Sequence, residues 1–172
     1  MKDEMKETIS RLMGRFPVKG SALLPVLSFI QKEKGHISEE DMKYISEAFN
    51  MPMARVFSTA SYYSLLNIKP AGKYNIRVCT NIVCSLLGGD PLFDHISGSL
   101  NIREGETTPD GLFTLTPVEC IASCAGAPAI LINLERYENM TPEKFDRMID
   151  SIRKREISSP PLEKGDERGS LE

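Results

Sequence analysis

Every cysteine of the chain belongs to one of two close pairs, and this arrangement constrains the fold more than any other feature. Cys79 and Cys84 lie in VCTNIVC, and Cys120 and Cys124 lie in VECIASC. Close pairs lower the entropy cost of bringing four ligands together, because only one long loop must be closed. Each pair also follows a stretch that is typical of a strand, so the backbone can leave a sheet there and curl around a ligand. We therefore expect the four thiols to hold an inorganic centre.

The composition is that of a folded chain without a nucleic-acid-binding surface. Hydrophobic residues make up 41% of the 172 residues, which is enough for a buried core. The net charge is −3, so no basic field points to DNA or RNA. We expect one domain of ordinary size or two small ones.

No stretch of the sequence predicts a membrane span or a secretion signal. The longest apolar run, residues 22–30, contains Pro25 and Ser28, and the N-terminal MKDEMKET lacks an apolar core. We therefore expect a cytoplasmic protein, in whose reducing environment the cysteines remain thiols or bind metal.

Residues 1–70 predict a helical bundle. Gly35 is a suitable end for the second helix, and Ser38 is a good N-cap for the third. Pro52 suits the first position of a fourth helix. The apolar residues recur at helical spacing and are expected to face inward: Met5, Ile9, Leu12, Met13 and Phe16, then Leu23, Val26, Leu27 and Ile30, then Met42, Ile45 and Phe49, then Val56, Phe57 and Ala60.

Residues 71–156 predict an α/β domain, in which strands and helices alternate. Strands are expected at 74–79, 113–118 and 129–132. Helices are expected to begin at Asp90–Pro91 and at Thr141–Pro142. The remaining residues, 157–172, contain SSPP and mixed charges and predict a disordered tail.

The spacing of the cysteines favours an iron–sulfur centre over its alternatives. Structural zinc sites most often pair cysteines two residues apart, although wider pairs occur. Plant-type ferredoxins also use a four-residue gap, but their third cysteine follows closely, and here it lies far along the chain. Zinc, disulfides and free thiols stay open as alternatives at this point.

The residues around the cysteines are small, which would let backbone amides approach the sulfurs and set a reduction potential. Leu86 and Leu87 are expected to exclude water from the centre. Arg77 could either tune the centre or extend into solvent. Tyr62 and Tyr63 are expected to be buried at a helix end, more than to contact a partner.

Several longer segments resemble one family. ALLPVL, ARVFSTASYYSLL, VCTNIVC, GETTPDGLFTL, VECIASCAGAPAILIN and YENMTPEKFD, spread over residues 20–155, are similar to the thioredoxin-like 2Fe–2S subunit of complex I-type NADH dehydrogenases. Related subunits occur in NAD-linked hydrogenases and formate dehydrogenases, including electron-bifurcating ones. The chain departs mildly from the family at Ser61, Tyr62 and Tyr63, where a Thr-Phe-Tyr run is common.

The resemblance implies a thioredoxin-like 2Fe–2S ferredoxin domain at 71–156, preceded by the helical bundle at 1–70. It implies one 2Fe–2S cluster on Cys79, Cys84, Cys120 and Cys124, and an electron-transfer role without catalysis by the isolated chain. It further implies docking to a flavoprotein subunit that carries FMN, a 4Fe–4S cluster and the NADH site, alongside further iron–sulfur subunits, in a complex that can associate with a membrane. It also raises the expectation of a cis peptide bond between Ala127 and Pro128.

Two other functions remain to be distinguished from this one. The cysteines could bind zinc and only staple an interaction module, or the chain could be a free-standing ferredoxin carrier. The sequence has no glycine-rich dinucleotide fingerprint after a strand, so we expect NAD(H) to bind elsewhere. The identity of the parent complex (NADH dehydrogenase, bifurcating hydrogenase or formate dehydrogenase) is left open.

Overall fold

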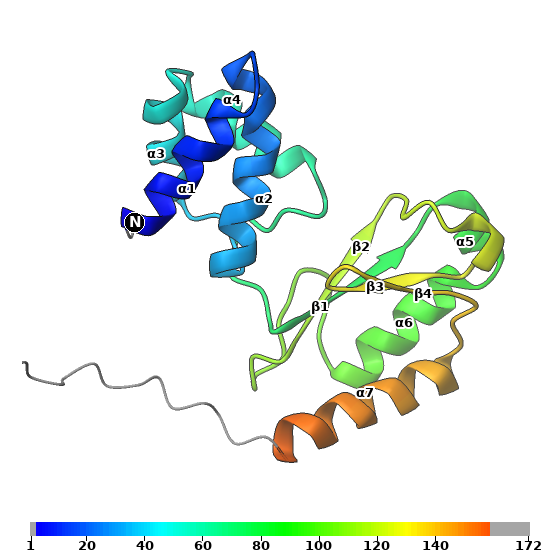
Figure 1. The fold of residues 1–172 in the computed structure, drawn as a ribbon. Helices are drawn as coiled ribbons and strands as arrows, with labels where there is room; N and C mark the ends of the chain where they lie inside the picture. The colour runs from blue at the N-terminus through cyan, green and yellow to red at the C-terminus, as the bar shows by residue number, and fades with distance from the viewer. Residues whose placement is uncertain (1–2, 159–172) are drawn as a thin grey trace, which may run out of the picture.

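The computed structural model describes residues 3–158, and its first part is helical, as predicted (Figure 1). The helices gather into one group, apart from the sheet that follows. They are α1 (Asp3–Gly14), the 3-10 helix η1 (Lys19–Ala22), α2 (Leu23–Lys34), α3 (Glu39–Phe49) and α4 (Met53–Tyr62).

The ends of α2 and α3 follow the predicted capping. Gly35 ends α2 with a φ of 82°, in the left-handed region that glycine adopts without steric cost. Ser38 caps α3, because its Oγ accepts from the backbone N–H of Asp41 while the Asp41 carboxylate accepts from the backbone N–H of Ser38. Lys34 adds a 2.5 Å ion pair with Asp41, which is only 1% exposed. These contacts fix the turn between the two helices.

The fourth helix differs from the prediction in two details. Pro52 is its N-cap and not its first helical residue, so α4 begins at Met53. Phe57, predicted to face inward, is 49% exposed. The buried residues of α4 are Val56 and Ala60, which are four residues apart and therefore lie on one side of the helix.

The second part is a mixed four-stranded sheet in the order β2-β1-β3-β4. The central strand β1 runs parallel to β2 and antiparallel to β3. Both long strands lie where the sequence predicts them, and β3 starts one residue later than expected. The sequence does not predict β4, since this strand is short and mostly exposed. The strands are β1 (Tyr74–Cys79), β2 (Phe113–Val118), β3 (Ile130–Ile132) and β4 (Glu135–Tyr137).

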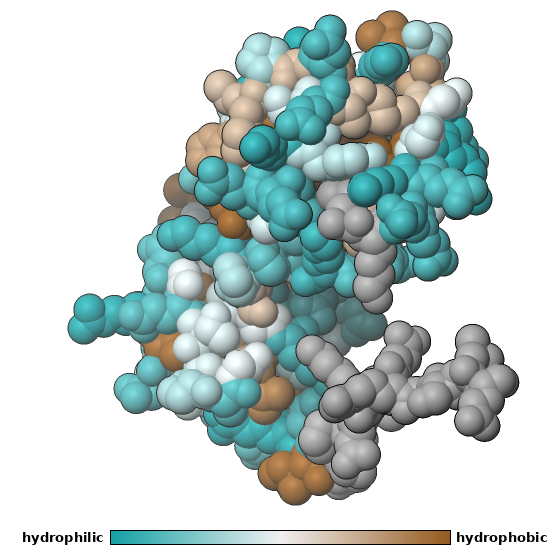
Figure 2. Space-filling model, turned by 90° about the vertical axis from the view of Figure 1, so that its left-hand side faces the viewer, coloured by the Kyte–Doolittle hydropathy of each residue, from teal (hydrophilic) through white to brown (hydrophobic). Residues whose placement is uncertain are grey.

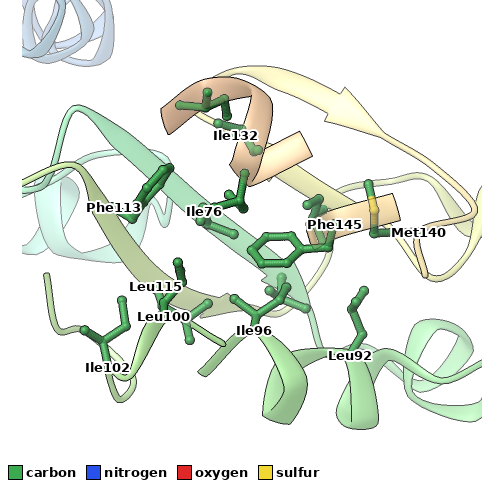
Figure 3. Close-up of a cluster of buried hydrophobic side chains, with 14 residues drawn as sticks. Ile76, Leu92, Ile96, Leu100, Ile102, Phe113, Leu115, Ile132, Met140 and Phe145 are labelled. Atoms are coloured by element: carbon green, nitrogen blue, oxygen red, sulfur yellow. The ribbon is translucent and has the colours of Figure 1, made fainter. Parts of the chain in front are cut away.

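Two helices, α6 (Gly89–Leu100) and α7 (Pro142–Ser158), cover one face of this sheet (Figure 1). Ile76 of β1 lies in the middle of the resulting core, with Phe145 of α7 and Ile96 of α6 directed toward it (Figure 3). Residues on this side alternate along each strand with residues of the opposite side, as the strand period of two requires. Thus Ile76 and Val78 join the core, whereas Asn75 and Arg77 bind the segment that precedes the sheet.

Two predicted boundaries are wrong in this part. Gly88, with a φ of 100°, is the N-cap of α6, and Asp90 lies inside the helix. There the Asp90 carboxylate accepts a hydrogen bond from Ser85 Oγ on the short helix α5 (Ile82–Leu86), instead of capping its own helix. Helix α7 runs to Ser158, two residues into the segment expected to be a tail. The rest of that predicted tail lies outside the described residues.

The two parts have separate hydrophobic cores. The helical core contains Ile9, Leu27, Ile45 and Val56, and Leu66 and Ile68 pack at its edge. The sheet core contains no residue before Ile76 among its buried members. The division of the chain at residue 70 stays a prediction, and this separation supports it.

One segment, residues 63–68, lies between both parts and is bound by each. From the helical side, Gln31 Nε2 donates to the Leu65 carbonyl at 2.6 Å, and the Asn67 carbonyl accepts from Ile37 N–H at 2.8 Å. From the sheet side, Arg77 and Asn75 donate to Asn67 Oδ1 at 2.9 and 3.1 Å. The connection is therefore an ordered part of the structure.

The surface that faces away from α5, seen in Figure 2, is mainly hydrophilic, with apolar residues in small areas only. Within residues 3–158, no helix is long and apolar enough to cross a membrane.

Candidate metal centre

The two cysteine pairs leave the sheet at the same end. Strands β1 and β2 are neighbours and run parallel, and their register pairs Cys79 with Val118. Cys79 is the last residue of β1, and Cys120 follows two residues after the end of β2. The backbone N–H of Thr80 donates to the Val118 carbonyl at 2.9 Å, which holds the two outgoing loops together. Parallel pairing thus brings two distant segments of sequence to one site.

The first pair is buried. Cys79 is 3% exposed and Cys84 is 2% exposed, the latter on the short helix α5 (Ile82–Leu86), which the sequence does not predict. Burial raises the pKa of the Cys84 thiol to about 11, and a hydrogen bond with Cys79 acts in the same direction. The backbone N–H of Ala129 opposes this shift by donating to the Cys84 sulfur. Without a metal, the Cys84 thiol is therefore protonated at neutral pH.

The second pair is exposed and lies on a tightly turned loop. Ala122, between the two cysteines, has a φ of 56°, which lies in the left-handed region. This turn lets the Ala122 N–H donate to Cys120 Sγ at 3.3 Å. Cys124 then begins the 3-10 helix η2 (Cys124–Gly126). Backbone amides therefore reach sulfurs of both pairs, at Cys84 and at Cys120.

Three of the predicted ligands, Cys79, Cys84 and Cys124, lie close together. Cys79 and Cys124 are both close enough to Cys84 to raise the pKa of its thiol. Cys120 lines a cavity of about 380 Å³ with Tyr63 and Leu65. All four cysteines are free thiols. In the described part of the chain, no three His, Cys, Asp or Glu side chains form a ready-made site for a single metal ion.

Close backbone packing supports the first loop. A Cβ built on Gly89 would lie 2.8 Å from the Cys84 carbonyl oxygen and 3.1 Å from that of Cys79. Only a glycine at this position lets α6 begin directly against the cysteine loop. Sequence reasoning from the cysteines misses this residue, although the Gly88–Gly89 doublet before a helix is a visible sign of close backbone approach.

The second loop is held by side chains and backbone of the segment that follows β4. Ser123, 6% exposed, donates through Oγ to the Glu138 carboxylate. The Asn139 N–H donates to the Gly126 carbonyl at 2.6 Å, and the Met140 N–H to the Pro128 carbonyl at 2.9 Å. The predicted cis peptide bond between Ala127 and Pro128 is confirmed. No sequence signal reveals the role of Ser123 and Glu138, because they meet only through tertiary folding.

Arg77 does not extend into solvent, one of its two expected placements. It is 2% exposed, and burial lowers the pKa of its guanidinium group. Its Nε donates to the Ser64 carbonyl at 3.1 Å, and Nη2 donates to the Leu65 carbonyl at 3.2 Å. Nη1 donates to the Asn133 carbonyl at 3.2 Å. The side chain therefore fastens segment 63–68 to the sheet.

Two other expectations about apolar residues are wrong. Tyr62 and Tyr63 are 83% and 44% exposed instead of buried, with their rings edge to face at a centroid distance of 5.5 Å. Leu86 and Leu87 are 78% and 57% exposed, so neither covers the cysteines. Cys84 is the buried residue of helix α5, and Leu86, two residues further on, lies on a different side of the helix.

The residues present fit a 2Fe–2S cluster. Four sulfur donors come from two neighbouring loops, and soft thiolates are the usual ligands of iron–sulfur centres. Amide donors already reach Cys84 and Cys120, which is the kind of contact that offsets the negative charge of such a centre.

Comparison with known proteins identifies relatives over most of the chain. A protein of Mycobacterium bovis, named as a component of NADH-quinone oxidoreductase, is 37% identical over 142 residues, covering 83% of this chain and 56% of that protein. A protein of Rhizobium meliloti, also named as a component of NADH-quinone oxidoreductase, is 34% identical over 149 residues, covering 87% and 89%. The chain thus spans only about half the length of the mycobacterial relative.

A solved structure and a family profile agree on the fold. A chain of an NAD+-reducing NiFe hydrogenase in the air-oxidised state superposes with a TM-score of 0.64 at 23% identity, covering 80% of this chain and 24% of that one. The predicted thioredoxin-like fold with preceding helices is confirmed. Residues 9–153 match the family described as thioredoxin-like 2Fe-2S ferredoxin. The chain belongs to this thioredoxin-like 2Fe–2S ferredoxin family.

Proposed function

We propose that the chain is an electron-transfer subunit of a multi-subunit NAD(H)-dependent oxidoreductase, and that Cys79, Cys84, Cys120 and Cys124 hold its single 2Fe–2S cluster. The observation that carries this proposal is the exit of both cysteine loops from the same end of β1 and β2. When bound, the cluster supplies one-electron storage and transfer. The protein supplies the four sulfurs and the amide donors around them.

The ligand assignment is tested by the metal content of the purified chain. Anaerobically purified protein should be reddish brown and contain two irons and two acid-labile sulfides per chain, as a 2Fe–2S centre requires. A colourless protein with one zinc would instead support the zinc-stapled interaction module and refute this proposal.

The parent complex is inferred from the relatives' names. Components of NADH-quinone oxidoreductase and an NAD+-reducing hydrogenase both connect such chains with NAD(H) chemistry. We place the nicotinamide, FMN and a 4Fe–4S cluster in a partner flavoprotein, because this chain has no dinucleotide fingerprint. The isolated chain should therefore not oxidise NADH. Robust turnover by flavin-free chain would contradict this division of labour.

An exposed apolar surface beside Cys120 supports docking of that flavoprotein. We call Tyr62, Tyr63, Leu65 and Leu134 the aromatic patch, with exposures of 83%, 44%, 44% and 75%. Tyr63, Leu65 and Leu134 line the same cavity as Cys120. Exposed tyrosines beside a concave apolar surface are typical of the central residues of protein interfaces. Docking here would bring the partner's redox group toward the second cysteine pair.

The assembly is tested by isolating the native complex. Gel filtration should recover the chain with a flavoprotein, together with further iron–sulfur subunits. A chain that runs alone and still exchanges electrons with soluble acceptors would support a free-standing ferredoxin carrier instead.

A further inference from the structure

Arg77 carries a buried positive charge that no carboxylate of the described residues balances. Its four hydrogen-bond acceptors are neutral: the carbonyls of Ser64, Leu65 and Asn133, and Oδ1 of Asn67. None of the ion pairs within residues 3–158 includes Arg77. Removing a charge from water is costly, so a buried arginine without an ionic partner requires a reason.

Arg77 lies on the same face of β1 as Cys79, the last residue of that strand. Arg77 and Cys79 are two residues apart on β1, and residues at this spacing share a face. The strand rise of about 3.3 Å per residue places their Cα atoms roughly 6.6 Å apart. The strand pairing extends this face to the neighbouring strands. Leu131 of β3 lies opposite Arg77, and Val118 of β2 lies opposite Cys79, so these residues share one face of the sheet. Leu131 and Val118 line one cavity together with Cys120.

The segment that Arg77 binds borders the same cavity. Ser64 and Leu65, whose carbonyls accept from Arg77, line the cavity beside Cys120. Arg77 thus holds segment 63–68 beside the cavity that Cys120 lines, and the arginine itself is only 2% exposed. With little water nearby, its field reaches farther than that of a surface cation.

We propose that Arg77 is a positioning residue for the cluster, whose buried charge raises the reduction potential while its hydrogen bonds fix segment 63–68 beside the second cysteine pair. This inference rests on the proposed function of the four cysteines. Four thiolates, two sulfides and two ferric ions carry a charge of about −2, which becomes about −3 when one electron is added. A nearby positive charge therefore stabilises the reduced state more than the oxidised state.

The test is an EPR-monitored redox titration of the purified, cluster-loaded chain. Arg77→Gln removes the charge, and at a fixed potential we expect a roughly tenfold lower ratio of reduced to oxidised protein. For a one-electron couple, this is a shift of about 59 mV to more negative potential. Arg77→Lys keeps the charge and should stay near the wild-type potential, while segment 63–68 becomes more sensitive to proteolysis because lysine cannot reach all four acceptors.

A second variant keeps Arg77 in place and balances its charge. Asn67→Asp puts a carboxylate at the atom that already accepts from Nη2 at 2.9 Å, so the potential should fall as it does in Arg77→Gln. The matched control is Arg136→Gln, because Arg136 lines the cavity beside Cys120 but its side chain is 50% exposed. Solvent screens that charge, and we expect a much smaller shift.

The outcomes separate this inference from the proposed function. If wild-type protein shows no 2Fe–2S signal, the proposed function itself fails. If the signal is present but the potentials of Arg77→Gln and Asn67→Asp equal that of the wild type, only the role of Arg77 is refuted. An equal shift in Arg77→Lys and Arg77→Gln would also refute it, because the effect would then follow packing and not charge.

Discussion

Gly89 packs directly against the carbonyl oxygen of Cys84, to which a Cβ at position 89 would come within 2.8 Å. The contact joins the start of α6 to the loop between the first two cysteines. It involves two backbone segments, neither of which can rotate away as a flexible side chain could. The geometry of the first cysteine pair therefore depends on a residue that has no side chain.

Replacing Gly89 by alanine should displace this loop. We expect Gly89→Ala to lower the free energy of unfolding by about 1–3 kcal/mol, the usual cost of overpacking, and to reduce cluster content. Thermal unfolding and the iron-to-protein ratio measure the two effects. The control is Gly98→Ala on the same helix, where a Cβ meets nothing within 4 Å. That variant should be neutral or more stable, because alanine favours the helix. Equal behaviour of both variants would contradict the prediction.

Serine substitutions test the ligands one by one. Cys79→Ser and Cys124→Ser should each lose or damage the cluster, because serine offers a hard oxygen that is protonated at neutral pH in place of a soft thiolate. Visible absorption and acid-labile sulfide report the loss. If both variants kept the wild-type spectrum, these two cysteines would not be ligands. Ser85→Ala, next to Cys84 on α5, is a control that should leave the spectrum unchanged.

The Lys34–Asp41 pair should make the stability of the helical part depend on pH. Burial of Asp41 acts to raise its pKa, but hydrogen bonds from Lys34 and Ser38 outweigh this, so the pKa lies below the ordinary value of 3.8. A lowered pKa stabilises the fold at pH values above the ordinary one. This stability is lost as the pH falls below 3.8 toward the folded-state pKa.

The pair is tested by urea unfolding of Asp41→Asn between pH 7 and pH 3. At pH 7 the variant should lose about 1–3 kcal/mol, because the amide leaves Lys34 without its ionic partner. Its stability should also fall less than that of the wild type on acidification. Glu40→Gln, at the exposed neighbouring position, should cost less than about 1 kcal/mol, the ordinary contribution of a charge at a helix start. Identical pH profiles for Asp41→Asn and wild type would refute the assignment.

The aromatic patch should act in docking and not in folding. Tyr62→Ala is expected to weaken binding to the flavoprotein by about 2 kcal/mol or more, the range of central interface residues, while cluster content stays unchanged. Calorimetry or pull-down with the partner measures the effect. Ile157→Ala is the control, since Ile157 is 85% exposed on the last turn of α7 and outside the patch. Undiminished binding by Tyr62→Ala would remove this tyrosine from the interface.

Much of the fold follows from local sequence. The capping of α3 by Ser38 and the stop of α2 at Gly35 were predictable because a cap depends on residues within one turn. Strands β1 and β2 were predictable from their β-branched and aromatic residues. Helix α5 and strand β4 escaped prediction because each is too short to show a period.

The sequence by itself determined the candidate ligands, since the two cysteine pairs and their neighbouring segments indicate a 2Fe–2S site of this family. Only the tertiary structure decided what surrounds them. The burial of Arg77, the approach of Gly89 to Cys84 and the exposure of Tyr62 depend on which faces meet once the chain has packed. Local sequence fixes conformation within a turn or a strand, whereas burial is a property of contacts between residues distant in the chain.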